Sequence, residues 1–184
     1  MHNLKIEGKE ELFMLFLAEP SVAYQDTFIQ SVHEFQAEGR QLNYDLNDLT
    51  NDFGAFVQEL HDAKDRSKLK PGRVPASDFW LIDKNEFIGR LSIRHVLNEF
   101  LLKMGGHIGY EIRPSRRKQG YGTEILGLGL EKAKELGLRR VLVTCDEDNS
   151  GSKKIIEHNG GQFENAIEME GDTVKKLRYW IDIE

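Results

Sequence analysis

The first part of the chain combines one short apolar run with two segments of helical period. The run at 11–21 is apolar from Leu12 to Ala18 and is closed by Pro20, which is typical of a strand. Segments 24–39 and 46–65 place apolar residues at helical spacing, and Gly39 supplies a stop for the first of them. The pattern therefore predicts a strand followed by two helices. The apolar faces consist of Phe28, Val32 and Phe35 in one segment and of Phe53, Phe56, Val57 and Leu60 in the other.

From residue 77 onward, period-two segments alternate with helical ones. Segments 77–83 and 86–95 flank the short turn Lys84-Asn85, which predicts a hairpin. Segments 107–113 and 139–145 read as strands on either side of a helix from about 120 to 136. The remaining elements are a loop at 96–106, a short helix at 149–158, and a closing hairpin made by 159–170 and 173–183.

These elements predict a mixed α/β fold in a single domain spanning 1–184. Hairpins favour antiparallel pairs, whereas the strand–helix–strand unit at 107–145 requires a parallel crossover. A central twisted mixed sheet of about six to seven strands, with helices on both faces, satisfies both requirements. The polar loop at 69–77 divides an N-terminal part, 1–70, from a core, 75–184.

Composition narrows the class of protein. Hydrophobic residues make up 39% of the chain, and no apolar run approaches the roughly 18 residues of a membrane span. The N-terminus lacks the apolar stretch of a signal peptide. The single cysteine, Cys145, argues against disulfides and cysteine-rich metal sites. We therefore expect a cytoplasmic protein with no metal and no membrane partner.

The charge is unevenly distributed along the chain. Residues 1–70 hold 7 Lys and Arg against 13 Asp and Glu, whereas residues 71–184 hold 18 of each. With a pI near 5.6, the chain is not expected to bind nucleic acid. A basic cluster at 113–118 stands out against this background, since four of its six residues are Arg or Lys.

This cluster precedes a glycine-bearing turn between a predicted strand and a predicted helix. Arg117, Gly120 and Gly122 follow the pattern Arg-x-x-Gly-x-Gly. Glycines allow a ligand to approach the backbone, and successive N–H groups at a helix start attract anions. The pattern favours a pyrophosphate site over an ordinary surface turn. It is not the dinucleotide fingerprint G-x-G-x-x-G, because position 125 is Ile.

Here the sequence resembles the GNAT superfamily of acyl-CoA-dependent N-acyltransferases. The family signature [Arg/Gln]-x-x-Gly-x-[Gly/Ala] is met by Arg117, Gly120 and Gly122. A second signature, an Asn that opens a short helix ending in a glycine turn and an aromatic, is met by Asn149, Gly160–Gly161 and Phe163. The resemblance covers about 75–184 and extends to a narrower group of predicted acetyltransferases without an established substrate.

The resemblance implies acetyl-CoA as co-substrate and a set of residues that would bind it. The pyrophosphate would lie on the loop that begins at Arg117, the pantetheine arm would pair with the strand that contains Tyr110, and the short helix would face this arm. The residues implied are Arg117, Lys118, Gln119, Gly120, Tyr121, Gly122 and Thr123 in the loop, Tyr110, Glu111 and Ile112 in the strand, and Asn149 and Ser152 in the short helix.

The catalytic acid and base are not at the family's usual places. Many members carry a Tyr seven residues after the Asn, and here that position is Ile156. Tyr110 is a substitute acid, with a half-buried strand tyrosine as the alternative. His95, His107 and Glu111 are candidate bases, of which His95 is preferred because it ends the hairpin. The alternatives are a structural histidine, or water as the base.

The sequence thus predicts an N-acetyltransferase that moves an acetyl group from acetyl-CoA to a primary amine by direct attack in a ternary complex. A non-catalytic acyl-CoA-binding module is the alternative, and the hairpins disfavour a nucleotide-binding domain. The acceptor is a small-molecule or peptide amine, and the oligomeric state stays open, a homodimer included. Carboxylates near the acceptor entrance would favour a cationic amine, unless they only keep the protein soluble; they are Glu34, Glu38, Asp45, Asp48, Asp52, Glu59 and Asp62.

Overall fold

The structure is a computed structural model that describes residues 15–168, 171 and 173–183 of the chain. Within this part, seven strands form one sheet in the order β1-β2-β3-β4-β5-β7-β6. Neighbouring strands are antiparallel except β4 and β5, which are parallel. The expected mixed sheet is confirmed. The strands are β1 (Phe16–Ala18), β2 (Ala76–Asp83), β3 (Glu86–Arg94), β4 (Ile108–Ile112), β5 (Arg140–Asp146), β6 (Gln162–Ile167) and β7 (Lys176–Asp182).

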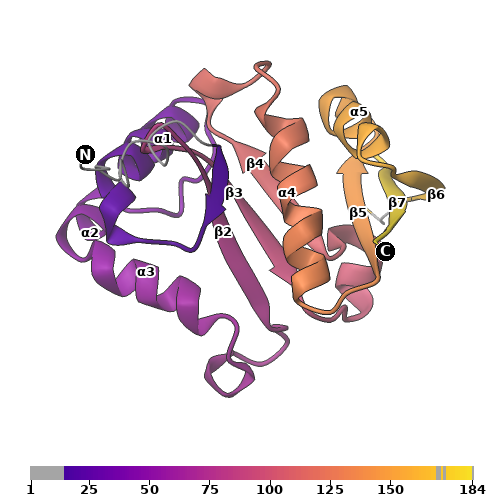
Figure 1. Ribbon diagram of the computed structural model, residues 1–184, viewed down its shortest axis with the longest axis horizontal. Helices are drawn as coiled ribbons and strands as arrows, with labels where there is room; N and C mark the ends of the chain where they lie inside the picture. Colours follow the sequence, from indigo (N-terminus) through magenta and orange to yellow (C-terminus); the bar gives the residue numbers. More distant parts are fainter. Residues whose placement is uncertain (1–14, 169–170, 172, 184) are drawn as a thin grey trace, which may run out of the picture.

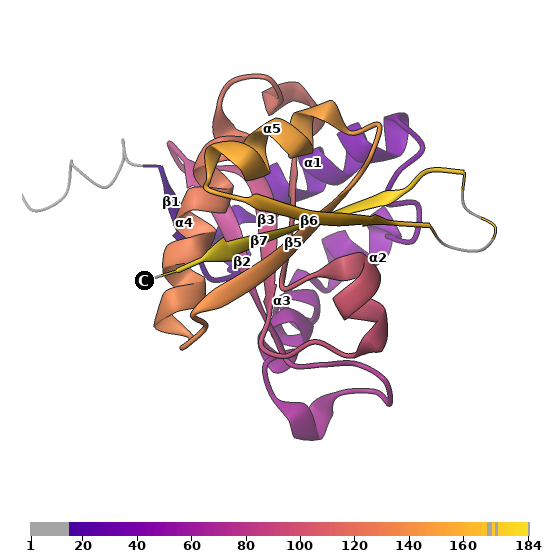
Figure 2. The same ribbon diagram turned by 90° about the vertical axis from the view of Figure 1, so that its right-hand side faces the viewer.

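Helices cover both faces of the sheet, as Figures 1 and 2 show. One face carries α4 (Tyr121–Glu135) and α5 (Ser150–His158), and the other carries α1 (Gln25–Ala37), α2 (Leu46–Asn51) and α3 (Phe53–Asp62). Alternate residues of β2 point to opposite faces, so Leu81 joins the core under α4 while Trp80 joins the aromatic core under α1. The sheet therefore separates two cores.

The second predicted helix is interrupted, which corrects the expectation of one helix over 46–65. Asp52 leaves the helical conformation, with φ −138° and ψ 52°, and its side chain accepts a hydrogen bond from the Ala55 N–H at 3.2 Å. Asp45 caps α2 in the same way, accepting from the Asn47 N–H at 2.8 Å. Short polar side chains at these positions start new helices because they satisfy otherwise unpaired N–H groups.

The predicted β2–β3 hairpin is confirmed. Lys84 and Asn85 form its turn with φ values of 49° and 65°. Two central residues with positive φ define a type I′ turn, whose twist matches that of the flanking strands.

On the α4 face, a Cβ at Gly129 would lie 2.4 Å from Leu91 Cδ1, so this glycine lets α4 approach β3 closely.

Two segments differ from the sequence prediction in detail. The loop expected at 96–106 contains a π-helical turn, Leu101–Gly105. The strand predicted within 11–21 is present as the three residues of β1, and residues 11–14 lie outside the described part of the chain.

Two further observations concern the described residues alone. None of their helices combines the length and the apolar character needed to cross a membrane. No group of three or more His, Cys, Asp or Glu side chains among them is placed to hold a metal ion.

Candidate active site

The parallel strands β4 and β5 separate soon after they meet. Their described residues pair at Ile108 and Val143, and the loop before α4 and the start of α5 follow where the two strands diverge. His107 holds the closed end, since its Nδ1 accepts a hydrogen bond from the Leu142 N–H at 2.9 Å. The gap leaves one side of β4 available for a ligand.

A cleft of about 480 Å³ lies over this gap, between α4 and α5, and we call it the α4–α5 cleft. It combines backbone of β4, the loop before α4 and the first turn of α5. Ten residues expected from the resemblance line it, namely Tyr110, Glu111, Ile112, Arg117, Lys118, Gly120, Gly122, Thr123, Asn149 and Ser152; Arg40, Gly151 and Ile155 complete the lining.

The glycine loop presents backbone donors to this cleft. Gly120 precedes α4 with a φ of 91°, and an added Cβ would meet no atom within 4 Å, so the space above it is open. Among the described residues, no hydrogen bond uses the N–H groups of 119–122, as is usual for the first N–H groups of a helix. The positive end of the α4 dipole adds to the attraction for an anion.

The basic cluster at 113–118 is largely neutralised by ion pairs within the protein. Arg113, which is buried, bonds to Glu34 and Glu86, and Arg116 also pairs with Glu86 at 2.6 Å. Arg117 pairs with Glu38 at 2.9 Å, and its Nε donates to the Ile112 carbonyl. These contacts dock the loop onto α1, which is a role that the sequence analysis did not foresee.

Some positive character nevertheless reaches the cleft. Lys118 lines it and is exposed, and no carboxylate in the described part of the chain pairs with it. Arg117 keeps one donor, Nη2, buried and without a hydrogen-bond partner among the described residues. Two loop residues expected at the site lie elsewhere: Gln119 donates to the Ser115 carbonyl at 3.1 Å, and the Tyr121 hydroxyl donates to Asp83 at 2.6 Å.

Asn149, Ser152 and Tyr110 meet on the other wall of the cleft. The Asn149 side chain accepts a hydrogen bond from the Ser152 N–H at 3.0 Å and so caps α5. The Tyr110 hydroxyl lies 3.5 Å from Ser152 Oγ. Burial raises the pKa of Tyr110 to about 12, so its hydroxyl stays protonated near neutral pH.

The candidate bases do not converge on the cleft. His95 shares a hydrogen bond of 2.9 Å with Ser77 Oγ, outside the residues that line the cleft. His107 is occupied at Nδ1 by its bond to β5. Burial lowers the pKa of both imidazoles. Glu111 lines the cleft, but its carboxylate is bound by Arg40 at 3.0 Å and by Arg90.

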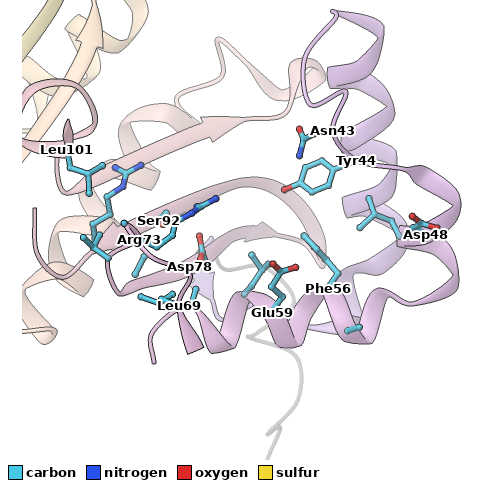
Figure 3. A pocket seen from close by; sticks show the side chains of 18 of the residues that line it. Asn43, Tyr44, Asp48, Phe56, Glu59, Leu69, Arg73, Asp78, Ser92 and Leu101 are labelled. Atoms are coloured by element: carbon cyan, nitrogen blue, oxygen red, sulfur yellow. The ribbon is translucent and has the colours of Figure 1, made fainter. Parts of the chain in front are cut away.

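A second, larger cavity of about 1040 Å³ opens on the opposite face of the sheet, and we call it the α2–α3 cavity. Figure 3 shows Tyr44, Glu59 and Asp78 pointing into it from the α1–α2 connection, α3 and β2. A polar chain joins it to the α4–α5 cleft, because Arg90 bonds both to Glu111 and, at 2.8 Å, to the Tyr44 hydroxyl. The two hollows therefore adjoin across β3 and β4.

The seven carboxylates expected near an acceptor have different roles. Glu34, Glu38 and Asp62 form ion pairs with Arg113, Arg117 and Lys68. Asp45 and Asp52 line the α2–α3 cavity but serve as helix caps. Asp48 also lines it, yet Figure 3 shows its carboxylate turned away from Asp78, so Glu59 is left as the expected carboxylate that points inward.

Sequence reasoning missed Asp78, Ser92 and Arg94, which line the α2–α3 cavity, and Arg40, which lines the cleft. The sequence did mark this face of β3 as polar, because the residues at 90, 92 and 94 are polar and alternate with apolar ones. Such alternation usually marks a solvated face. Only the arrangement of α1–α3 makes this face the floor of a cavity.

Comparison with known families agrees with this geometry. Residues 16–162 match the family model described as "Acetyltransferase (GNAT) domain". The chain belongs to the GNAT acetyltransferase family. As a member, it is an acetyl-CoA-dependent acetyltransferase. The resemblance inferred from the two glycine and asparagine motifs is thus confirmed, and no match was found among proteins of curated function.

Solved GNAT structures share the fold. RimJ of Mycobacterium smegmatis in complex with CoA-disulfide is 20% identical, with a TM-score of 0.68 over 93% of this chain and 83% of that one. An acetyltransferase of Salmonella typhimurium that modifies the N-terminal serine of ribosomal protein L7/L12 is also 20% identical, with a TM-score of 0.63 over 91% and 94%. The microcin C7 self-immunity acetyltransferase MccE, in complex with acetyl-CoA and AMP, is 15% identical, with a TM-score of 0.66 over 91% of each chain.

The residues of this GNAT domain fit acetyl-CoA. A Cβ at residue 120 would fill the open space above Gly120. The N–H groups at 119–122 have no hydrogen-bond acceptor among the described residues, and Lys118 adds a positive charge. The unpaired donor of Arg117 lies at the same wall. These features match the anionic pyrophosphate of acetyl-CoA at the mouth of the cleft and its narrower pantetheine arm along β4.

Proposed function

We propose that the protein acetylates a primary amine by direct attack in a ternary complex, with acetyl-CoA in the α4–α5 cleft and the amine in the α2–α3 cavity. The observation that carries this proposal is that the two hollows lie on opposite faces of the sheet and are linked through Arg90, with the gap between β4 and β5 on the cleft side. Two substrates entering from opposite faces would meet at this gap without competing for one entrance.

Acetyl-CoA would be held mainly by backbone groups. The N–H groups at 119–122 and Lys118 would bind the pyrophosphate, and β4 from Tyr110 to Ile112 would pair with the pantetheine arm as a further strand does. Backbone donors of β4 would polarise the thioester carbonyl in the manner of an oxyanion hole. Asn149 and Ser152 would face the arm from α5.

Tyr110 is our candidate for the acid that protonates the leaving thiolate. The family's usual position is Ile156, a fully buried residue with no proton to give. The Tyr110 hydroxyl lines the cleft and, with a pKa of about 12, carries its proton near neutral pH. Tyr110→Phe should lower kcat more than it weakens CoA binding, whereas Tyr24→Phe, outside both hollows, should change neither. Equal kcat in Tyr110→Phe and the parent would remove Tyr110 from this role.

The acceptor would be a small-molecule or peptide amine. The Salmonella relative acts on a protein N-terminal serine, which supports a peptide α-amine as one class to test. Glu59 and Asp78, which point into the α2–α3 cavity in Figure 3, support a cationic amine. His95, which lies against Ser77, would contribute to acceptor binding only indirectly.

A coupled assay tests this function. Purified protein, acetyl-CoA and a panel of alkylamines, polyamines and short peptides with free N-termini would be monitored for release of the CoA thiol, and acetylated products identified by mass. Calorimetry would measure CoA binding in parallel. We expect CoA to bind and at least one amine class to turn over. CoA binding without turnover across the panel would instead favour the non-catalytic acyl-CoA-binding module.

A further inference from the structure

A row of three residues crosses the sheet beneath the α2–α3 cavity. Asp78 on β2 pairs in register with Ser92 on β3, and Ser92 pairs with Gly109 on β4. Residues directly opposite one another on neighbouring strands point to the same face. Asp78, Ser92 and Gly109 therefore share the face that carries the cavity, which Asp78 and Ser92 both line.

Gly109 ends this row without a side chain of its own, at the strand where acetyl-CoA would bind. It adjoins Tyr110, and it has no side chain to fill the space above β4. An added Cβ would lie 3.6 Å from Arg94 Nη2, so the Arg94 guanidinium is the side-chain group nearest to this position. With strands about 4.8 Å apart, Asp78 and Gly109 lie about two strand spacings from each other, with Ser92 between them, so an amine that contacts Asp78 would lie above Ser92 in the cavity.

Other proton acceptors near this place are already engaged. Glu111 is bound by Arg40 and Arg90, so its carboxylate oxygens are already engaged within the protein. His107 accepts a hydrogen bond through Nδ1, and His95 lies against Ser77 outside the cavity lining. In the described part of the chain, Asp78 forms no ion pair within 4 Å, although Arg90 and Arg94 lie close enough to act on its charge.

We propose that Asp78 binds the attacking ammonium group of the acceptor and accepts its proton, which makes it the general base of the reaction. The proposal rests on the proposed function, since it assigns a residue to the acceptor side of the same site. It needs a carboxylate on the cavity face, in register with a residue of β4, the strand along which acetyl-CoA would bind. Asp78 meets both conditions, and its side chain points into the hollow in Figure 3.

The proton and bond changes balance without a further reactant. Asp78 takes one proton from the ammonium group, and the neutral amine attacks the carbonyl carbon of the thioester. The new C–N bond forms as the C–S bond breaks, and the electron pair of the C–S bond leaves with sulfur. Tyr110 protonates the thiolate and the second nitrogen proton restores the Tyr110 hydroxyl, so the products are the amide, the free CoA thiol and protonated Asp78, which returns its proton to solvent.

The surroundings of Asp78 tune its proton affinity. Burial raises the pKa of this carboxyl above its ordinary value, and Ser92, Arg90 and Arg94 partly offset the increase. A raised pKa brings a carboxyl closer to the range of an effective base. The base form is present above this pKa, so the rate should fall as pH decreases through it. The charged and titratable groups facing it are Arg90 and Arg94 on β3, Glu59 on α3, Tyr44 before α2, Arg73 in the 69–77 loop and Glu111 on β4.

The test replaces Asp78 with Asn, which keeps the size and a hydrogen-bonding group for Ser92. Asp83→Asn is the matched control, because Asp83 lies on the same strand, also accepts from a hydroxyl, and lines neither hollow. With the best alkylamine of the panel at neutral pH, Asp78→Asn should lower kcat about 100-fold or more, and Asp83→Asn should leave it unchanged. CoA binding and thermal stability should stay close to the parent values in both.

A second acceptor separates base catalysis from a structural role. A β,β,β-trifluorinated analogue of the same alkylamine has a much lower pKa and is largely neutral at the assay pH, so it needs less help to lose its proton. Asp78→Asn should therefore lose far less activity with the fluorinated amine, and its rate should lack the acid limb of the parent pH profile. An equal loss with both amines, or no loss with either, would overturn the assignment while the proposed function stood. A parent protein that acetylates no amine would overturn both.

Discussion

Arg117 and Glu38 form an ion pair that ties the CoA loop to the end of α1. Arg117 Nη1 lies 2.9 Å from the Glu38 carboxylate, and Glu38 is the residue that caps the C-terminus of α1. The ring of Phe35 lies beneath the guanidinium, 5.5 Å away. These contacts hold the loop in place, and the Glu38 carboxylate neutralises most of the formal charge of Arg117. We therefore expect phosphate binding to depend on backbone N–H groups and on Lys118.

Because Lys118 has no ion-pair partner among the described residues and the arginines are paired, replacing different residues of the basic cluster should change CoA affinity by different amounts. Lys118→Ala should weaken CoA binding about tenfold, because a charge-assisted hydrogen bond to a phosphate contributes about 1.5 kcal/mol. Arg116→Ala should change affinity by less than about twofold, since its guanidinium pairs with Glu86 and does not line the cleft. Calorimetry with CoA would measure both, and a larger loss in Arg116→Ala would contradict this expectation.

Gly120 and Gly137 provide a matched pair for testing the loop. Both have positive φ, 91° and 85°, and neither would place a Cβ within 4 Å of another atom, but only Gly120 lines the cleft. Replacement by Ala should cost each variant about 1 kcal/mol of folding free energy, because L-residues are strained at positive φ. Only Gly120→Ala should also lose CoA affinity, by about tenfold or more. Chemical denaturation and calorimetry would measure the two quantities; normal CoA binding by folded Gly120→Ala would place the pyrophosphate elsewhere.

Stability should decline at alkaline pH. Burial raises the pKa of Cys145 from 9.0 to about 11 and that of Tyr110 from 10.0 to about 12. The unfolded chain releases these protons first, so stability is fully present below about pH 9 and is lost as pH rises through the folded values. Urea midpoints between pH 7 and 11.5 would trace the decline. The urea midpoint of Tyr110→Phe should fall less steeply above pH 10 than that of the parent protein. An equal slope in the two proteins would show that Tyr110 does not contribute to the decline.

The inward carboxylates predict a preference for cationic acceptors. Glu59 and Asp78 face the α2–α3 cavity, so a diamine should have a lower KM than a neutral-tailed amine of equal length. The difference should be about two- to fivefold at low salt and should shrink at high salt through screening. Glu59→Gln should reduce the preference. A preference that salt leaves unchanged, or none at all, would favour the view that these carboxylates only maintain solubility.

Local pattern was sufficient for most of the secondary structure and for the cofactor loop. Turn chemistry at Lys84-Asn85 and the glycines at 120 and 122 act through the backbone of a few consecutive residues, so their consequences can be read without the rest of the molecule. The helical period around Phe28 and the apolar stripe that faces the core in α4 are likewise local. Asp52 was the exception, because a capping side chain inside a helical pattern divides the helix when the chain must turn.

What the sequence alone determined was therefore the order of the elements, the mixed sheet and the loop that would meet a phosphate. Only the tertiary structure decided which charges remain available there, since the partners of Arg113, Arg116 and Arg117 are carboxylates 27 to 79 positions away in the chain, in α1, at its C-terminal end and in β3. It also decided that Asp78 faces a cavity in line with Gly109. Charge pairing and cavities depend on distances between segments far apart in sequence, and no local period records those distances.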